Sequence, residues 1–418
     1  MDITIPYGKE TISITLPEPV VILRPNMPRI QDKNHLILNA LKSPIGAQSF
    51  QSFAQQAKRL LIIVNDATRP TPTSTILEYL SPILQKHSDV KFLVATGVHR
   101  APTQEEYEFI FGKTFTVFQN KISAHDARRD EDMVYLGKSS NGTEMYINKL
   151  VQDYKNVVVI GSVEPHYFAG YTGGRKSFLP GVASYKTIEM NHKLALHESA
   201  CSLKLEGNPV HEDMVDAMNV LKNINVFSIQ TVLTGDHQLY AVTAGDLLQS
   251  FDAAIEHANH IFCVPLKEKG NIVISAAPYP MDIDLYQSQK AIDNAKHALE
   301  KGGILILVSK CRMGVGEEAF IELLSKACTP QEVFSILDQE YKLGFHKAAK
   351  MAEIGIHNHL WAVTDLDNSI IKKTMMKPYN NLQQAVDDAI QTIQKKGEQP
   401  KIVVMPQGSL TIPHYTGG

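Results

Sequence analysis

The feature of this sequence that most restricts its fold is a series of short apolar runs rich in β-branched residues. Each run is followed by a polar or glycine-containing turn and then by a stretch with helical spacing. The runs are 59–66 (RLLIIVND), 90–97 (VKFLVATG), 154–161 (YKNVVVIG), 270–277 (GNIVISAA) and 302–309 (GGILILVS). A continuous apolar run suits a parallel strand that is buried on both faces. We therefore predict an α/β fold whose sheets are mainly parallel and flanked by helices.

The length of 418 residues favours two domains, because one hydrophobic core seldom grows that large. The segment 264–271 (VPLKEKGN) is charged, contains Pro and Gly, and precedes a new apolar run. We place an N-terminal domain at 1–266 and a C-terminal α/β domain at 267–394, and we expect the closing strand, about 395–418, to join the first domain. Residues 3–17 (ITIPYGKETISITLP) alternate about a Gly-Lys turn and predict a β-hairpin.

The composition excludes several classes of protein. The formal net charge is −3 and 44% of the residues are hydrophobic, so neither nucleic acid nor an anionic membrane is an expected partner. The four cysteines form no zinc-binding or disulfide pattern, and the opening residues lack the apolar segment of a secretory signal. We therefore expect a cytoplasmic protein.

Charged and titratable residues follow three of the apolar runs, in turns rich in Gly, Pro and Thr. These turns are 66–74 (DATRPTPTS), 96–100 (TGVHR) and 164–177 (EPHYFAGYTGGRKS). Ligands of open parallel sheets bind beyond the carboxyl ends of the strands, where such turns meet. The convergence of the three turns predicts a functional site there.

The first turn places Asp66 and Arg69 three residues apart, ahead of Thr and Ser residues at a predicted helix start. Backbone N–H groups at a helix start suit a phosphate or carboxylate, and Arg can bind either group through two hydrogen bonds. An Asp that caps a helix beside an Arg ion pair explains the same residues equally well.

Residues 170–177 (GYTGGRKS) nearly match a phosphate-binding loop, but Arg175 replaces its last Gly and the preceding run is too distant. We therefore exclude a nucleoside triphosphatase of the P-loop type. Lys176 remains as a lysine in a Gly-rich loop. It is either a surface residue or the anchor of a covalently bound cofactor.

Sixteen histidines are present, so most must be structural or exposed. His99 and His166 stand out because they lie in turns after successive apolar runs, where two imidazoles can act as an acid/base pair on opposite sides of a substrate. His192 lies on a predicted helix with His197 five residues further on, a spacing that does not suit two metal ligands on one helical face. By itself, His192 is more typical of a packed histidine.

In the second domain, Tyr286, Gln287 and Lys290 fall within about one turn of a predicted helix that follows the run at 270–277. They are either substrate-binding residues or the first turn of an ordinary amphipathic helix. The single tryptophan, Trp361, is more typical of a core residue than of a pocket wall. No GxGxxG motif follows the first apolar runs, which argues against a nicotinamide-dependent dehydrogenase.

Over nearly its whole length, the sequence resembles the nickel-pincer nucleotide-dependent lactate racemase family of 2-hydroxy acid racemases. The motifs that carry the resemblance are DATRPTP (66–72), ATGVHR (95–100), HDARR (125–129), EPHYFAGYTGGRK (164–176), MNH (190–192) and DLYQSQK (284–290).

The resemblance implies a cofactor, nickel pyridinium-3,5-bisthiocarboxylic acid mononucleotide (the nickel-pincer nucleotide). Lys176 matches the lysine to which it is covalently attached, and His192 matches the histidine that binds the nickel. The stretch Asp66, Ala67, Thr68 and Arg69 matches the cofactor-contacting turn. Proteins that synthesise this cofactor are then expected partners.

The same resemblance assigns the substrate-handling residues. His99 and His166 match the catalytic acid/base pair, and Arg69, Tyr286, Gln287 and Lys290 match the residues around the substrate carboxylate, in an active site that we expect in the cleft between the two domains. The implied activity is interconversion of D- and L-lactate by hydride transfer through a 2-oxo acid, a route that avoids removing the barely acidic C2 proton.

Two alternatives remain open. The same chemistry can act on another 2-hydroxy acid such as malate, 2-hydroxyglutarate or phenyllactate, because the residues matched here do not define the pocket around C3. A non-catalytic nucleotide- or metal-binding protein would also carry a modified Lys176, but it would need neither two acid/base histidines nor a carboxylate-binding set.

Overall fold

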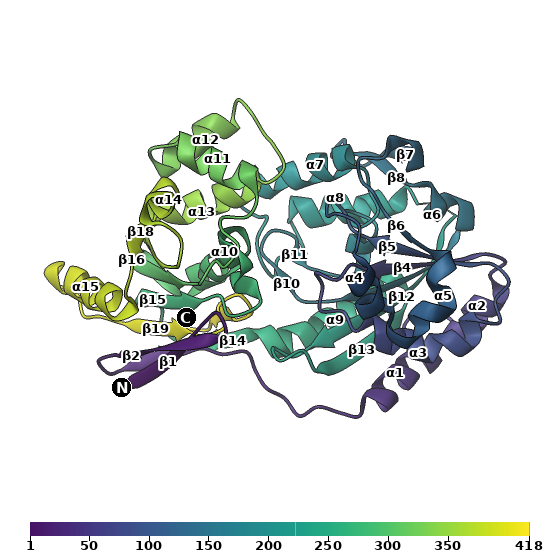
Figure 1. Cartoon of the computed structure of the whole chain (residues 1–418), viewed down its shortest axis with the longest axis horizontal. Coiled ribbons are helices and arrows are strands. Elements are labelled where there is room, and N and C mark those ends of the chain that lie inside the picture. Colours follow the sequence, from purple (N-terminus) through teal and green to yellow (C-terminus); the bar gives the residue numbers. More distant parts are fainter. Residues whose placement is uncertain (222, 418) are drawn as a thin grey trace. The chain divides into compact units, whose positions relative to one another are not determined.

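The computed structural model describes residues 1–221 and 223–417 (Figure 1). The chain divides into two compact units, one formed by Met27–Ile261 and the other by Met1–Asn26 together with Phe262–Gly418. Each unit is built around its own six-stranded sheet. The prediction of α/β architecture with mainly parallel sheets flanked by helices is confirmed.

The sheet of unit 27–261 has the strand order β13-β12-β9-β4-β5-β6. All neighbouring strands are parallel except β12 and β13, which form an antiparallel pair. The strands are β4 (Leu60–Asn65), β5 (Val90–Ala95), β6 (Ile122–Ala124), β9 (Asn156–Ser162), β12 (Asn225–Leu233) and β13 (Leu239–Gly245).

Both faces of this sheet are buried, which explains the continuous apolar runs. On β4, Ile62 and Val64 pack into the core on one face, whereas Leu61 and Ile63 pack into the core on the other. The first face is covered by α1 (Lys33–Lys42), α2 (Phe50–Gln56), α3 (Thr73–Leu84), α4 (Gln104–Phe111) and α5 (Phe115–Phe118). A strand whose side chains alternate between two cores needs apolar residues at every position.

The second face is covered by α6 (Lys149–Tyr154) and by the segment around Phe178 and Val182. The other elements of this part of the chain are β7 (Met133–Lys138), β8 (Glu144–Asn148), β10 (Pro165–His166), β11 (Gly170–Tyr171), α7 (Tyr185–Lys193), α8 (Pro209–Asn219) and α9 (Leu247–Phe262).

The sheet of the other unit has the order β18-β17-β16-β15-β19-β3 and is parallel throughout. Its strands are β3 (Val20–Ile22), β15 (Gly270–Ala276), β16 (Leu299–Val308), β17 (His359–Val363), β18 (Lys377–Tyr379) and β19 (Ile402–Met405). A separate parallel pair joins β14 (Cys263–Leu266) to β20 (Ile412–Tyr415).

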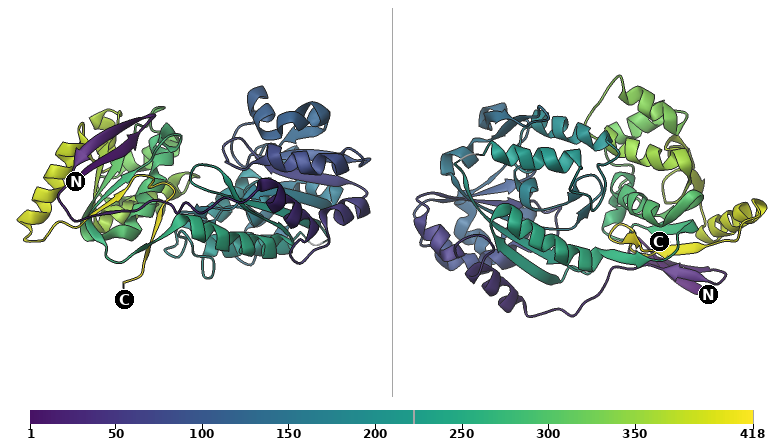
Figure 2. Two further views of the ribbon diagram at one scale, coloured as in Figure 1. Left: turned by 90° about the horizontal axis from the view of Figure 1, so that it is seen from below. Right: turned by 180° about the vertical axis from the view of Figure 1, so that it is seen from behind.

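One face of this second sheet is covered by α15 (Leu382–Lys395) and by the predicted hairpin, which forms as β1 (Asp2–Tyr7) and β2 (Glu10–Thr15) (Figure 2). Helices α10 (Leu285–Ala295) and α13 (Phe345–His357) pack on each other and on the strands, and α11 (Glu318–Lys326), α12 (Pro330–Leu337) and α14 (Asn368–Lys373) complete the unit. In the part of the chain that the structure describes, no helix is long and apolar enough to cross a membrane.

The observed units differ from the predicted domain boundaries at both ends of the chain. The opening hairpin and β3 belong with residues 262–418, and so does the closing segment that we expected in the first domain. The reason is strand pairing, because β19 inserts between β15 and β3 and hydrogen-bonds to both. The central boundary, predicted after residue 266, lies close to the observed one after Ile261.

The first prediction concerns the N-terminal hairpin. Ile5 is fully buried in the core that also contains Trp361, whereas its neighbour Thr4 is exposed. Ile5→Ala should lower the stability of this unit by about 2–5 kcal/mol, the usual cost of such a cavity. Trp361 is the only tryptophan, so its fluorescence during urea unfolding reports on this unit. Thr4→Ala is the matched control, and an unchanged urea midpoint for Ile5→Ala would contradict the hairpin's place in the core.

Candidate active site

The turns that follow β4 and β9 are joined by a chain of polar contacts at the carboxyl ends of these neighbouring strands. Asn65 donates through Nδ2 to Thr71 Oγ1 at 3.1 Å, and the Thr71 hydroxyl donates to Ser162 Oγ at 2.9 Å. Thr172 in turn donates to the Ser162 carbonyl at 2.9 Å. The structure therefore brings two of the three predicted turns together.

Asp66 and His99 form a close pair that links the turn after β4 to the turn after β5. The Asp66 Oδ2 atom lies 2.7 Å from Nδ1 of His99. The Asp66 side chain is 7% exposed, whereas that of His99 is 44% exposed. Of the two tautomers of the neutral ring, a carboxylate at Nδ1 selects the one with its proton on Nδ1, so that Nε2 of His99 carries the lone pair.

The neighbours of Asp66 hold it ionised. Burial by itself would raise the pKa of Asp66, but the hydrogen bonds from His99 and Thr68 and the charge of Arg69 outweigh burial, and the pKa lies below its ordinary value. Thr68 donates to Asp66 Oδ1 through its hydroxyl at 2.6 Å and its backbone N–H at 3.2 Å. The predicted alternative of an Asp66–Arg69 ion pair therefore gives way to a pair with His99. The fourth residue of this turn, Ala67, is half-buried and packs on the core below.

The position of His99 follows from the turn that carries it. The backbone N–H of His99 donates to the Thr96 carbonyl at 3.0 Å, and the Thr96 hydroxyl donates to the His125 carbonyl at 2.6 Å. Gly97 has φ +56°, a conformation that disfavours side chains, and its N–H donates to Gly181.

Phe168 is the centre of the second group of predicted residues. Its ring centroid lies 4.5 Å from that of His166 and 5.0 Å from that of His192. The Lys176 ammonium lies 5.2 Å from the same centroid. The lysine, the predicted metal-binding histidine and one of the two predicted acid/base histidines thus surround one aromatic ring.

The backbone sets the tautomer of His166. The N–H of Ala169 donates to Nδ1 of His166 at 3.3 Å, across the tight turn between β10 and β11. In the neutral ring the proton then lies on Nε2. His99 and His166 therefore present opposite groups at Nε2, a lone pair on the first and an N–H on the second.

Arg175 fixes the loop that carries Lys176. Its guanidinium is fully buried and donates to the carbonyls of Ala169 at 2.6 Å and Tyr171 at 3.0 Å, while it stacks on Phe251 at 4.5 Å. Burial lowers the pKa of Arg175 to about 9, which leaves the group charged at neutral pH. The charge is bound by carbonyl dipoles of the loop itself, so this residue supports the loop from inside.

The HDARR motif (125–129) supports α7, the helix that carries His192 in its last turn. His125 is buried and contacts the Ala183 carbonyl through Nε2 at 2.9 Å, and Arg128 stacks on Tyr185 at 4.0 Å. Ser184 caps the helix. The role of this motif is thus structural, and it positions the helix that carries His192.

The chemistry of these side chains suits a bound group that is held covalently and by one imidazole. Lys176 supplies an amine and His192 supplies an imidazole, and both side chains lie against the ring of Phe168. Within residues 1–221 and 223–417, no group of three or more His, Cys, Asp or Glu side chains could hold a metal ion. An amine and an imidazole are groups that can attach a cofactor covalently and bind a metal, respectively.

Of the predicted substrate-binding residues, Arg69 lies in the turn after β4, and the other three lie in the other unit, on the first turns of α10. Asp284 caps this helix by accepting the N–H of Gln287 at 2.6 Å. Tyr286, Gln287 and Lys290 are half-buried, and Tyr286 and Lys290 are four residues apart, which places them on one face of the helix.

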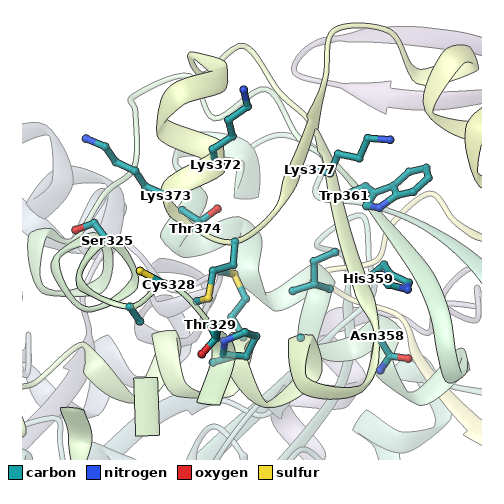
Figure 3. Close-up of a pocket in the computed structure, with 17 residues that line it drawn as sticks. Ser325, Cys328, Thr329, Asn358, His359, Trp361, Lys372, Lys373, Thr374 and Lys377 are labelled. Carbon is teal, nitrogen blue, oxygen red and sulfur yellow. The ribbon is translucent and has the colours of Figure 1, made fainter. Parts of the chain in front are cut away.

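A cavity of about 580 Å³ in the same unit contains none of the predicted site residues (Figure 3). It lies beside the start of β17, and Cys328, His359 and Lys377 are among its lining residues. Trp361 also borders it, but it is 7% exposed and packs on Tyr379 in the main core. Trp361 is thus a core residue, as predicted, and it also contributes to the wall of a pocket.

Two residues of this site were not predicted from the sequence. Phe168 has no polar group that would draw attention to it, and Arg175 stood out only as a departure from the phosphate-loop pattern. Its place between two glycines and a lysine was the available signal, because a long cation in a tight loop must be either exposed or bound to backbone carbonyls.

The chain matches known protein families over most of its length. The family described as lactate racemase N-terminal domain matches residues 7–203, and that described as lactate racemase C-terminal domain matches residues 266–412. The lactate racemase of Thermoanaerobacterium thermosaccharolyticum is 32% identical over 97% of this chain and 98% of its own length. That of Lactiplantibacillus plantarum is 30% identical over the same shares, 97% and 98%.

Solved structures agree with these matches. The lactate racemase apoprotein of Thermoanaerobacterium thermosaccharolyticum superposes with a TM-score of 0.91 and 32% identity, covering 99% of this chain and 100% of the other. A protein from Thermotoga maritima has a TM-score of 0.65 at 15% identity, covering 88% and 97% of the two chains, and so shares the fold alone.

The second prediction tests the Asp66–His99 pair through pH. Because the pKa of Asp66 is lower in the folded chain, its stabilising effect is present above the unfolded pKa of about 3.9 and is lost as the pH falls through the folded pKa. Asp66→Asn should therefore cost about 1–3 kcal/mol at pH 7 and progressively less towards pH 3. Unfolding of the cofactor-free protein measures this. A difference between wild type and variant that does not depend on pH would contradict an ionised, hydrogen-bonded Asp66.

Proposed function

This chain belongs to the lactate racemase family, and from that membership we propose that it interconverts the enantiomers of a short 2-hydroxy acid through a 2-oxo acid. It is thus a racemase, an isomerase. Lactate is the substrate named for its relatives and is the first compound to test. The observation that carries the proposal is the placement of His166, Lys176 and His192 around Phe168, together with the Asp66–His99 pair.

We propose that the nickel-pincer nucleotide is the cofactor and that cofactor-synthesis proteins supply it. When bound, this group supplies a nickel-activated pyridinium ring that accepts and returns hydride. Lys176 would hold it covalently and His192 would bind its metal. The turn Asp66–Arg69 would contact the nucleotide, where backbone N–H groups and a guanidinium suit a phosphate.

The proton chemistry falls to the two histidines. His99 can accept the proton of the substrate hydroxyl at Nε2, because Asp66 holds the other ring nitrogen protonated. His166 can act on the other side from Nε2: as imidazolium it would give one proton to the oxygen of the 2-oxo acid and return to the neutral ring, while His99 becomes imidazolium by taking the hydroxyl proton. In the opposite direction the two residues exchange these tasks, as a racemase requires.

We assign the substrate carboxylate to Arg69, Gln287 and Lys290, with Tyr286 beside them. A guanidinium and an ammonium are the usual partners of a carboxylate. These residues would bind only the C1 carboxylate, so they do not determine which substituent at C3 the enzyme accepts. The acid/base and carboxylate residues therefore serve lactate and larger 2-hydroxy acids equally.

The third prediction concerns Lys176. Protein purified with the cofactor-synthesis proteins should carry an added mass, and Lys176→Ala should lose it because no amine remains for attachment. Intact-protein mass spectrometry measures the addition. Lys193→Ala, which removes an exposed lysine on α7, is the control and should keep the added mass. Full modification of Lys176→Ala would remove Lys176 from the proposal.

The fourth prediction tests the reaction. The loaded enzyme should convert either enantiomer of its substrate into a racemic mixture, and His99→Ala or His166→Ala should each slow both directions by at least about 100-fold, the usual contribution of one acid/base group. Chiral chromatography of single-enantiomer 2-hydroxy acids measures this. Covalent attachment without racemisation of any of them would instead support a cofactor carrier, and a variant that reacts in only one direction would argue against a shared pair.

A further inference from the structure

The cavity beside the start of β17 has an apolar wall. Met351 and Leu360 contribute almost fully buried side chains to it, and Pro330 and the half-buried Met375 also line it. Its volume of about 580 Å³ lies within the range of pockets that hold small organic molecules. The cavity therefore offers both the room and the apolar surface that the body of such a molecule needs.

The charged residues that line this cavity are all lysines. Lys372, Lys373 and Lys377 are exposed at one side of it, and the described lining contains no Asp or Glu (Figure 3). His359 also lines the cavity, but burial lowers its pKa, so it adds no charge at neutral pH. Acidic residues outnumber basic ones in the whole chain, 44 to 41, so this purely basic lining is a local feature that favours an anion.

Two of the three lysines have no carboxylate partner. The Lys377 ammonium lies 4.5 Å from the ring centroid of Trp361 and 3.9 Å from Asp388 Oδ2. Within residues 1–221 and 223–417, Lys372 and Lys373 form no ion pair. Their side chains extend outward from the rim in Figure 3, and the flexible stem of a lysine allows the ammonium to turn towards an anion at the mouth.

The cavity is separate from the residues assigned to the substrate. It borders the first residues of β17, 359–361, and so lies at the amino end of that strand. Helix α10 begins beyond the carboxyl end of β15, and β15, β16 and β17 are parallel neighbours. The cavity and the first turns of α10 thus lie at opposite ends of the same strands. A ligand in the cavity is therefore not the substrate of the proposed reaction.

We propose that this cavity binds a second ligand, an amphiphilic organic anion with an apolar body and a single carboxylate or phosphate group. The body packs against the wall that contains Met351 and Leu360, and the anionic group forms charge-assisted hydrogen bonds with Lys372 and Lys373. The inference goes beyond the proposed racemase activity and does not depend on it, because none of the residues assigned to that reaction lines the cavity.

The competing explanation is that the lysines are ordinary solvated side chains beside an unused hollow. In that case an amphiphile would bind only through its apolar part, and the lysines would not affect its affinity. A set of probes that carry the two features together or singly separates these explanations. Octanoate and octyl phosphate carry both features, octan-1-ol carries only the apolar body, and acetate carries only the charge.

The fifth prediction is selective binding of the probes that carry both features. Trp361 lines the cavity and is the only tryptophan, so its fluorescence in the cofactor-free full chain reports on binding. Octanoate or octyl phosphate should change this emission saturably, and the tighter of the two identifies the anionic group. Octan-1-ol and acetate should each bind at least about tenfold more weakly, because each lacks one of the two contacts. Isothermal titration calorimetry gives the same affinities without relying on fluorescence.

Paired substitutions test the lysines directly. Lys372→Gln combined with Lys373→Gln should weaken the tighter probe at least about tenfold. Both side chains are exposed, so the urea midpoint should stay unchanged. Lys395→Gln combined with Lys396→Gln removes two adjacent exposed lysines at the end of α15, outside the cavity, and should bind as the wild type does.

Three results would overturn the proposal of an anion site. They are the absence of saturable binding of both amphiphilic anions, equal affinity for octan-1-ol and octanoate, and an unchanged affinity in the Lys372/Lys373 variant. Because the measurements use the cofactor-free chain, they stay decisive whether or not the loaded enzyme racemises a hydroxy acid.

Discussion

The candidate active site depends on one buried interaction, the Arg175 guanidinium inside the loop that carries Lys176. A fully buried cation is costly unless polar groups surround it. Here the carbonyls of Ala169 and Tyr171 and the face of Phe251 surround it. Those carbonyls belong to the turn that also sets Phe168 and His166. If the guanidinium were absent, the carbonyls would point into a cavity without a donor, and the loop would lose the contact that orients them.

That loop geometry in turn fixes proton positions. The Ala169 N–H reaches Nδ1 of His166 because β10 and β11 form a tight antiparallel turn. The Asp66 carboxylate reaches Nδ1 of His99 because β4 and β5 are neighbours in the sheet. In both cases backbone architecture, rather than a bound ligand, decides which ring nitrogen carries the proton. The two rings are therefore held by the fold itself, and the groups that they present at Nε2 differ for a structural reason.

Much of this arrangement was predictable from the sequence, because a buried parallel strand can be recognised from its own residues. A strand buried on both faces must be apolar throughout, and the turn after it must hold any ligand-binding residues. That argument identified His99 and His166, and the family resemblance added Lys176 and His192. Which distant strand such a strand pairs with cannot be recognised in the same way. Nothing in the sequence of β19 states that it pairs with β15, and so the closing strand was assigned to the other domain.

The roles of Arg175 and Lys347 were not predictable for the same physical reason. A lysine or arginine in a sequence is most often solvated, and only the fold shows that these two are buried. Both charges are bound by groups of their own unit. Arg175 donates to carbonyls of its own loop, and Lys347 donates to the carbonyl of Tyr286 on α10 and lies against its ring. A buried cation that meets a backbone carbonyl holds two segments together, and the sequence around it does not show which carbonyl it will reach.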